Sequence, residues 1–379
     1  MNILYIETSI SPHRGGVQRV TWSISEFLKK NGFDIFFAYH LVDYDMVQED
    51  HKLKFSTNWT HDKFFKTLSA FIIKNKIDVI ISQDRKTPFY TETYKKIKIK
   101  KLCKKIHCVH QSPDYFKNME TSLMQKIKKL LYYIRNGQSY RVTQEQSIYH
   151  IAEHTILLSE LFKKDYIELN AIKDNSKLIA ISNPLSFNTY AGKNEIENKE
   201  KTVLIITRFE EKQKNIKSAL RIWSEVTKNT NNDWKLVLAG YGNDEEMILN
   251  YAKELKLKNF EFIGKVIHTE EYFNKASLFM MTSHYEGFGI TLTESLQKGC
   301  IPIAFNTYSA VRDIIVHGYN GYIIQPYDEK LYANRIIELI NNKEKMMQMQ
   351  YNAIASSKKF DIENIGNQWI NLLKEIQND

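Results

Sequence analysis

The sequence predicts an α/β protein with two domains, each built on a parallel sheet. Three observations predict this class. Short apolar runs, typical of strands buried on both faces, alternate with longer amphipathic runs typical of helices. The alternation is interrupted at Asn183-Pro184 and restarts at Val203. The chain has 379 residues, which is enough for two domains of ordinary size.

The first half opens with a strand, a glycine loop and a helix. The strand is 2–6, the loop ends at Gly15-Gly16, and the helix runs from Val17 to about Lys30. Further strands are expected at 33–40, 77–82, 106–110, 155–159 and 177–181, with a helix at 63–74. Residues at the carboxyl ends of parallel strands point into the ligand crevice, so His110 is a candidate site residue. The polar run 188–201 is expected to be the linker between the domains.

The second half places two cations beside its first strand. The strand 203–207 delivers Arg208, and Lys214 stands just before a helix expected to begin near Asn215. Two fixed cations beside a crevice suit a departing diphosphate, because negative charge builds up on the leaving oxygen. The next strand, 235–240, turns at Gly240 and Gly242, and a strand at 260–264 follows.

A strand, a glycine loop and a helix then carry two carboxylates. Strands are expected at 277–282 and 301–305, and Glu286 and Glu294 lie between them. Gly287 and Gly289, which flank Phe288, allow a sharp turn, and the amides of Gly289 and Ile290 would open a helix that attracts phosphate. A carboxylate accepts two hydroxyl hydrogen bonds at once, so both glutamates suit a sugar ring or a ribose.

The remaining elements close the second domain. A helix is expected at 311–316, a turn at 318–321, a strand at 322–325, and helices at 330–358 with a break and at 362–377.

Composition bounds the partners and the compartment. No apolar run is long enough to span a bilayer, and the first residues lack the features of a signal peptide. The three cysteines show no disulfide or zinc-knuckle spacing, which favours a reducing cytoplasm. The net charge of +9 indicates an anionic partner. Because no nucleic-acid-binding pattern accompanies the charge, nucleic acid is excluded as the expected partner.

Two lysine-rich stretches leave the nature of that partner open. One covers 94–105, and the other joins Lys126, Lys128, Lys129 and Arg135 with neighbouring leucines and tyrosines. Basic residues beside aromatic ones are typical of an interfacial contact with an anionic membrane, as a peripheral protein makes at the inner face of the cell membrane. A solvated helix face in a lysine-rich protein explains the same pattern.

The motifs together resemble retaining glycosyltransferases of the GT-B fold, family-4 type, also called group 1. The resemblance rests on the diglycine loop, the Arg208 and Lys214 pair, and the two glutamates eight positions apart. It implies two Rossmann-like domains facing a central crevice, with a C-terminal helix that crosses back to the first domain. The implied boundaries are 1–187 with 360–379 for the acceptor domain, and 188–359 for the nucleotide-sugar domain.

The resemblance also implies roles for individual residues. Arg208 and Lys214 would grip the diphosphate, Glu286 would position the transferred sugar, and His110 would touch that sugar near the reacting carbon. The residues implied to bind the donor are Gly16, Gly240, Gly242, Gly287, Phe288, Gly289, Ile290 and Glu294, with Glu294 on the ribose.

The implied reaction transfers a sugar from a nucleotide diphosphate to an acceptor hydroxyl with retention of configuration. No metal or other cofactor is expected. UDP carrying a hexose or an N-acetylhexosamine is the favoured donor, and GDP-mannose stays open, because 306–312 departs from the glycine-rich loop of the family. The expected acceptor is a glycan or a polyprenyl-linked glycan, as in bacterial surface-polysaccharide assembly. The alternative is a non-catalytic binding or scaffold protein at the membrane.

Two further motifs are weaker. His150-Ile-Ala-Glu-His154 matches a zinc-protease pattern, but it continues directly into an expected strand and no third ligand stands out. Asp43-Tyr-Asp45 resembles a metal-binding acid pair, but it lies in an early loop and is interpreted as a solvated turn.

Overall fold

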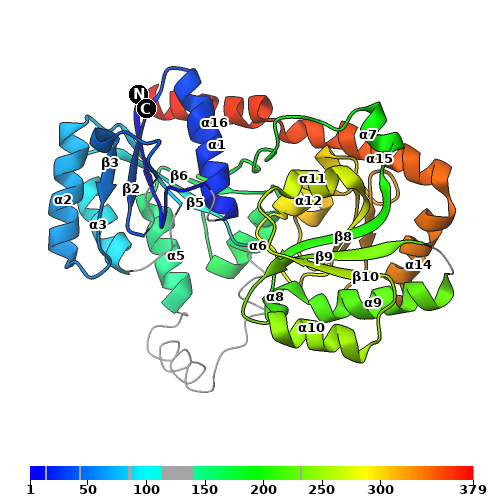
Figure 1. Cartoon of the computed structure of the whole chain (residues 1–379). Helices are drawn as coiled ribbons and strands as arrows, with labels where there is room; N and C mark the ends of the chain where they lie inside the picture. Colours follow the sequence, from blue (N-terminus) through cyan, green and yellow to red (C-terminus); the bar gives the residue numbers. More distant parts are fainter. Residues whose placement is uncertain (13–14, 42–43, 84–87, 113–139, 231–232, 379) are drawn as a thin grey trace. The chain divides into compact units, whose positions relative to one another are not determined.

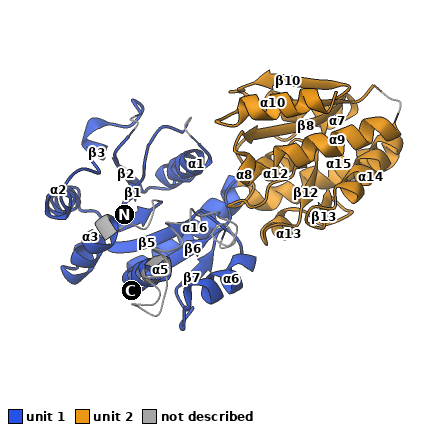
Figure 2. Cartoon of the chain, turned by 90° about the horizontal axis from the view of Figure 1, so that it is seen from below, with its two compact units in different colours: residues 1–184, 362–379 blue, residues 185–361 orange. Residues whose placement is uncertain are grey.

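The computed structural model describes residues 1–12, 15–41, 44–83, 88–112, 140–230 and 233–378 (Figure 1). They form two compact units (Figure 2). Unit 1 contains 1–184 and 362–379, and unit 2 contains 185–361. The basic cluster from Lys126 to Arg135 lies outside the described residues, and so does Asp43.

Unit 1 is built on a sheet in which every described strand pairs in parallel. The order is β3-β2-β1-β4-β5-β6-β7. The strands are β1 (Asn2–Ile6), β2 (Asp34–Tyr39), β3 (Lys52–Lys54), β4 (Val79–Ser82), β5 (Lys104–Val109), β6 (His154–Leu157) and β7 (Leu178–Ala180). The apolar run of β1 is almost completely buried, as a strand covered on both faces requires.

Helices cover both faces of this sheet. The helices of unit 1 are α1 (Gly16–Lys30), α2 (His61–Lys74), α3 (Pro88–Ile99), α5 (Tyr140–Ile151), α6 (Leu161–Asn170), α16 (Ile362–Asn378) and a 3-10 turn at Glu49–His51. Apolar side chains of α2 and α3 form one core cluster with Leu4, Ile6 and Ile80. On the other face, Trp22 of α1 stacks on Phe37 of β2.

Unit 2 repeats the arrangement. Its parallel sheet has the order β10-β9-β8-β11-β12-β13. The strands are β8 (Glu200–Arg208), β9 (Lys235–Tyr241), β10 (Phe260–Gly264), β11 (Ala276–Met281), β12 (Ile301–Phe305) and β13 (Tyr322–Ile324). In both units the strand order reverses beside the first strand, which is the doubly wound, Rossmann-like topology. The predicted fold class is thereby confirmed for each unit.

The helices of unit 2 lie on the two faces of its sheet, with α9, α10 and α14 on one side and α11, α12 and α15 on the other (Figure 1). The helices are α7 (Lys193–Glu197), α8 (Glu211–Lys214), α9 (Ile216–Asn229), α10 (Glu245–Glu254), α11 (Thr269–Lys275), α12 (Ile290–Gln297), α13 (Val311–Ile314), α14 (Glu329–Asn341), α15 (Lys343–Ser357) and a 3-10 turn at Lys358–Phe360. The predicted break in the 330–358 helix is confirmed at Asn342.

The prediction of a linker over 188–201 was wrong. This stretch contains α7 and the start of β8, and it belongs to unit 2. The buried Lys298 ammonium holds it by donating to the Thr189 carbonyl at 2.7 Å and to the Thr189 hydroxyl at 2.9 Å. The polar composition of this segment was misleading, because the partner that orders it, Lys298, lies more than a hundred residues away in the sequence.

The last helix returns to unit 1, as predicted. Helix α16 packs on α1, and Gly366 lies directly against the ring of Phe27. A Cβ at position 366 would approach Phe27 Cδ1 to 2.2 Å. The contact therefore requires glycine on the face of α16 that meets α1.

Gly366→Ala tests this packing. Alanine favours a helix by about 1 kcal/mol over glycine, but overpacking costs about 1–3 kcal/mol, so we expect a net loss of thermal stability. Circular dichroism melting of the variant is compared with that of Asn371→Ala, a change at an exposed position of α16. An unchanged or raised melting temperature in Gly366→Ala would contradict the packing.

Candidate active site

The structure brings Lys214 and Glu286 into direct contact. The Lys214 ammonium lies 2.7 Å from Glu286 Oε1, and the two side chains are only 15% and 10% exposed. Ser283 Oγ donates to the same carboxylate oxygen at 2.6 Å. A carboxylate has about four lone-pair sites, so Oε2 keeps capacity to accept hydroxyl hydrogen bonds. The residue predicted to bind the diphosphate and the residue predicted to bind the sugar therefore form one largely buried ion pair.

Adjacent strand ends account for this contact. Strand β8 pairs with β11, so the segments that follow them meet at one edge of the sheet. Asn215 Nδ2 donates to the Thr282 carbonyl at 3.1 Å, and Thr282 Oγ1 donates to the Asn215 carbonyl at 2.9 Å. These reciprocal hydrogen bonds join the residue after Lys214 to the residue after β11. They fix the positions of the two segments relative to each other, and so bring Lys214 to Glu286.

Arg208 is connected to the Lys214–Glu286 pair through Gln213, but its side chain is less restrained. It is the last residue of β8, and its side chain is 55% exposed. Its Nη2 donates to Gln213 Oε1 at 3.2 Å and lies 3.3 Å from Glu210 Oε2. The predicted pair of cations is thus present on neighbouring segments, with Lys214 held by Glu286 and Arg208 held by Gln213 and Glu210.

The glycine loop opens α12 as predicted. Gly289 caps the helix with a φ of 96°, and Ile290 is the first helical residue. A Cβ on Gly289 would lie 2.5 Å from the Tyr308 hydroxyl, so only glycine fits. Phe288 is buried, with its ring edge-on to Phe360 at a centroid distance of 5.6 Å. Its side chain has a packing role, which leaves the backbone of Gly287-Phe288-Gly289 as the part of the loop that faces a ligand in our hypothesis.

Glu294 lies on α12 itself and its residue is 2% exposed. The structure therefore places Glu286 and Glu294 on one continuous loop and helix. The role of Glu294 at a ribose stays a prediction.

Gly240 and Gly242 bring β9 close to the end of β8. A Cβ on Gly240 would lie 1.9 Å from the Thr207 carbonyl oxygen, and one on Gly242 would lie 2.3 Å from the Phe209 carbonyl oxygen. Both glycines are thus required by packing beside Arg208. Whether their backbone also contacts a donor stays a prediction.

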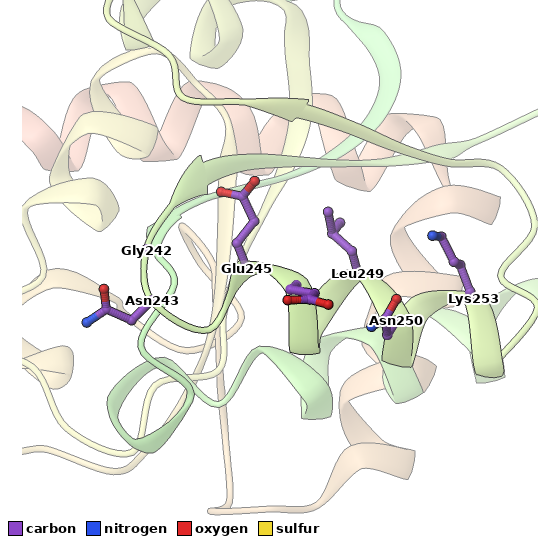
Figure 3. A pocket seen from close by; sticks show the side chains of 7 residues that line it. Gly242, Asn243, Glu245, Leu249, Asn250 and Lys253 are labelled. Atoms are coloured by element: carbon purple, nitrogen blue, oxygen red, sulfur yellow. The ribbon is translucent and has the colours of Figure 1, made fainter.

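A pocket next to Gly242 does not suit the diphosphate. Figure 3 shows it along α10, lined by Gly242, Asn243, Glu245, Glu246, Leu249, Asn250 and Lys253. Two carboxylates and one ammonium give the lining a net negative charge. We therefore do not assign this pocket to the predicted donor site.

Unit 1 carries the other two predicted residues. Gly16 is the first residue of α1, and His110 follows β5. The His110 ring nitrogen Nε2 is hydrogen-bonded to Gln83 Oε1, at the end of the neighbouring strand β4. Because the amide oxygen accepts, Nε2 carries the proton and Nδ1 is an acceptor. Burial lowers the pKa of His110 to about 4, so the ring is neutral near pH 7.

Sequence reasoning missed four residues of these arrangements: Gln83, Gln213, Ser283 and Tyr308. Ser283 lies three residues before Glu286 in the loop, but no motif distinguishes it. Tyr308 lies in the segment that departs from the family's glycine-rich loop. Burial and the nearby Glu286 carboxylate raise the pKa of its hydroxyl well above the ordinary value, so the hydroxyl stays protonated.

The zinc-protease pattern is split between two elements. His150 is near the end of α5, whereas His154 begins β6. Within the described ranges, no group of three or more His, Cys, Asp or Glu residues is arranged to hold a metal ion. No helix among those ranges is long and apolar enough to cross a membrane.

Solved structures share this fold over the whole chain. A crystal structure of the Anabaena protein HepE with UDP and glucose matches with a TM-score of 0.72 at 16% identity, covering 99% of this chain and 100% of that one. Sucrose-phosphate synthase from Thermosynechococcus elongatus gives a TM-score of 0.77 at 16% identity, covering 100% and 99%. These are matches of fold, and with the two doubly wound units they define the class: the chain has the GT-B fold.

The sequence comparisons find similarity to glycosyltransferases. Residues 186–356 match the family model described as "Glycosyl transferases group 1". An uncharacterized glycosyltransferase of Haemophilus influenzae is 24% identical over 95% of this chain and 96% of its own length. Most of unit 2 therefore matches the model of the group 1 glycosyltransferases, and the whole chain is similar to a glycosyltransferase.

Two further relatives have more specific names. An undecaprenol-linked α-1,4-N-acetyl-D-galactosaminyltransferase of Campylobacter jejuni is 27% identical over 58% of this chain and 60% of its own length. A poly(glycerol-phosphate) α-glucosyltransferase of Bacillus subtilis is 29% identical over 46% of this chain, which spans only 26% of that longer protein.

The lowered pKa of His110 predicts a pH effect on stability. The unfolded chain binds a proton at this ring near pH 6.5, whereas the folded chain does so only near pH 4. Stability contributed by the neutral ring is present above about pH 6.5 and is lost as the pH falls toward about 4. His110→Gln should remove this component, so the difference in melting temperature between wild type and variant should shift across that window. A difference that is constant from about pH 7 to about pH 4 would contradict the assignment.

Proposed function

We propose that this chain is a retaining glycosyltransferase that acts without a divalent metal. It transfers a hexose or an N-acetylhexosamine from a nucleotide-diphosphate sugar to a hydroxyl of a lipid-linked glycan. UDP is the favoured nucleotide, and the product serves the synthesis of bacterial surface polysaccharide.

The observation that carries the proposal is the Lys214–Glu286 pair beside the amino end of α12. It lies where β8 and β11 are neighbours, which is the point of unit 2 where the strand order reverses. Ligands of doubly wound sheets bind outside the carboxyl ends of the strands at such a point. Arg208, Lys214 and the first amides of α12 supply positive charge there, and a diphosphate is the group that this charge suits.

In the proposed reaction the two cations stabilise the leaving group. The bond from the anomeric carbon to the diphosphate oxygen breaks, and a bond from that carbon to the acceptor oxygen forms on the same face. The acceptor proton passes to the departing diphosphate. Arg208 and Lys214 act on the charge that develops on the leaving oxygen, which is the largest source of stabilisation in reactions of this kind.

Glu286 positions the sugar in this scheme. Retaining glycosidases use two carboxylates about 5–5.5 Å apart, one of them as nucleophile. Here the charge of Glu286 is stabilised by Lys214 at 2.7 Å and by Ser283 at 2.6 Å, which lowers its reactivity. The same two contacts hold the carboxylate in one orientation, which suits a residue that accepts hydrogen bonds from sugar hydroxyls. The fixed cations take the part that a metal ion has in other transferases.

The names of related proteins support the donor and the acceptor. HepE was crystallised with UDP and glucose, and the pneumococcal O-GlcNAc transferase GtfA with UDP and GlcNAc. GDP-mannose stays an alternative, since a Dictyostelium discoideum relative is named as a GDP-Man mannosyltransferase. The Campylobacter relative is named for an undecaprenol-linked glycan, which supports a lipid-linked acceptor.

A membrane contact in the cytoplasm is part of the same proposal. At the end of α3, Lys98, Lys100 and Lys101 are exposed beside Ile99, which is 80% exposed. Such a surface can approach anionic lipid headgroups with its lysines while Ile99 meets the apolar layer.

Lys214→Ala tests the role of the cation. Loss of one leaving-group contact should lower turnover on the order of 100-fold without unfolding the chain. Turnover is measured as nucleotide release from the donor sugar, with and without acceptor. Because Lys212 is an exposed lysine on the same short helix, Lys212→Ala is the matched control and should keep nearly full activity. Lys214→Ala activity above about a tenth of wild type would contradict the assigned role.

A further inference from the structure

Gln213 contacts both Arg208 and the loop segment that directly precedes Glu286. It is the residue before Lys214 on α8, and it is half-buried. Its Oε1 accepts from Arg208 Nη2 at 3.2 Å. Its Nε2 donates to the Tyr285 carbonyl at 3.4 Å, and its own carbonyl accepts from the His284 amide at 2.8 Å.

These partners determine the orientation of the amide. A guanidinium can only donate hydrogen bonds and a backbone carbonyl can only accept them. The oxygen of the Gln213 amide must therefore face Arg208, and the nitrogen must face Tyr285. Exchanging the two would break both contacts, so Arg208 and the loop before Glu286 act together to hold one rotamer.

Gln213 orients Arg208 without neutralising it. Glu210 also contacts Arg208, at 3.3 Å, but this pair is exposed, with 55% and 42% of the two side chains open to solvent. Exposed ion pairs contribute little, and an arriving diphosphate competes with the Glu210 carboxylate for the same guanidinium. A neutral amide leaves the full positive charge of Arg208 for the ligand.

Gln213 also connects Arg208 to the carboxylate that positions the sugar. Tyr285 directly precedes Glu286, so the two contacts on 284–285 fix the start of the glycine loop against α8. An apolar side chain at position 213 would keep the backbone contact with His284 and lose both side-chain contacts.

We propose that Gln213 is a positioning residue that aims Arg208 at the diphosphate of the donor and couples it to the loop carrying Glu286. The inference rests on the proposed function of the site. It predicts that Gln213 acts on nucleotide binding through Arg208, and that it has little effect once Arg208 is absent.

The test uses Gln213→Met, which keeps the length of the side chain, and Gln213→Ala, which covers the case in which the methionine variant folds poorly. Binding of UDP, GDP and ADP to the full-length protein is measured by calorimetry. We expect both variants to bind the preferred nucleotide about tenfold more weakly than wild type, because a hydrogen bond to a charged group is lost. Glu210→Gln, which removes the competing carboxylate from the same guanidinium, should bind it at least as tightly as wild type.

A double-mutant cycle with Arg208→Ala separates positioning from packing. If Gln213 acts through Arg208, the double variant should bind the nucleotide less than about twofold more weakly than Arg208→Ala alone, because the effects of coupled residues are not additive. Additive losses, or single variants that bind as wild type does, would overturn the positioning role alone. A wild-type protein that binds none of the three nucleotides would overturn the proposed function as well.

Discussion

The pairing of β8 with β11 is the constraint on which the candidate site depends. Parallel strands bring the segments after their carboxyl ends together, so Lys214 meets the loop that carries Glu286 although the two segments are far apart in the sequence. The Asn215–Thr282 hydrogen bonds fix the two segments at one height, and the Lys214–Glu286 pair forms between them. The geometry of the candidate site in unit 2 is thus a consequence of strand order.

Close backbone packing supports the same arrangement. Gly240 and Gly242 lie so near the end of β8 that no side chain would fit, and a side chain on Gly289 would collide with the Tyr308 hydroxyl. At each of these positions the close packing requires glycine, whether or not the glycine amide also binds a ligand. A glycine in such a loop therefore indicates first that two segments pack closely, and its contact with a donor needs separate evidence.

Much of the fold could be predicted from the sequence because both domains follow simple periodicities. The buried strands β1 and β11 and residues 203–206 of β8 are largely apolar runs, and the motif at 286–294 predicts the turn and the start of α12 correctly. The failures were at 188–201, where distant partners such as Lys298 order a polar segment, and at Gln213 and Ser283. Gln213 matters through side-chain contacts with Arg208 and Tyr285, and Ser283 through a hydrogen bond to Glu286. Such contacts leave no periodic or compositional signal in a single sequence.

Binding of a nucleotide-diphosphate sugar by unit 2 at the Lys214–Glu286 pair is the property that the proposed function requires first. The decisive measurement is a thermal-shift and nucleotide-release screen against UDP-, GDP-, ADP- and dTDP-sugars, with Glu294→Gln as the matched variant. We predict that one nucleotide class stabilises the wild-type protein, that slow nucleotide release accompanies it, and that the variant loses both. A cooperatively melting wild-type protein that none of these donors stabilises would contradict the account.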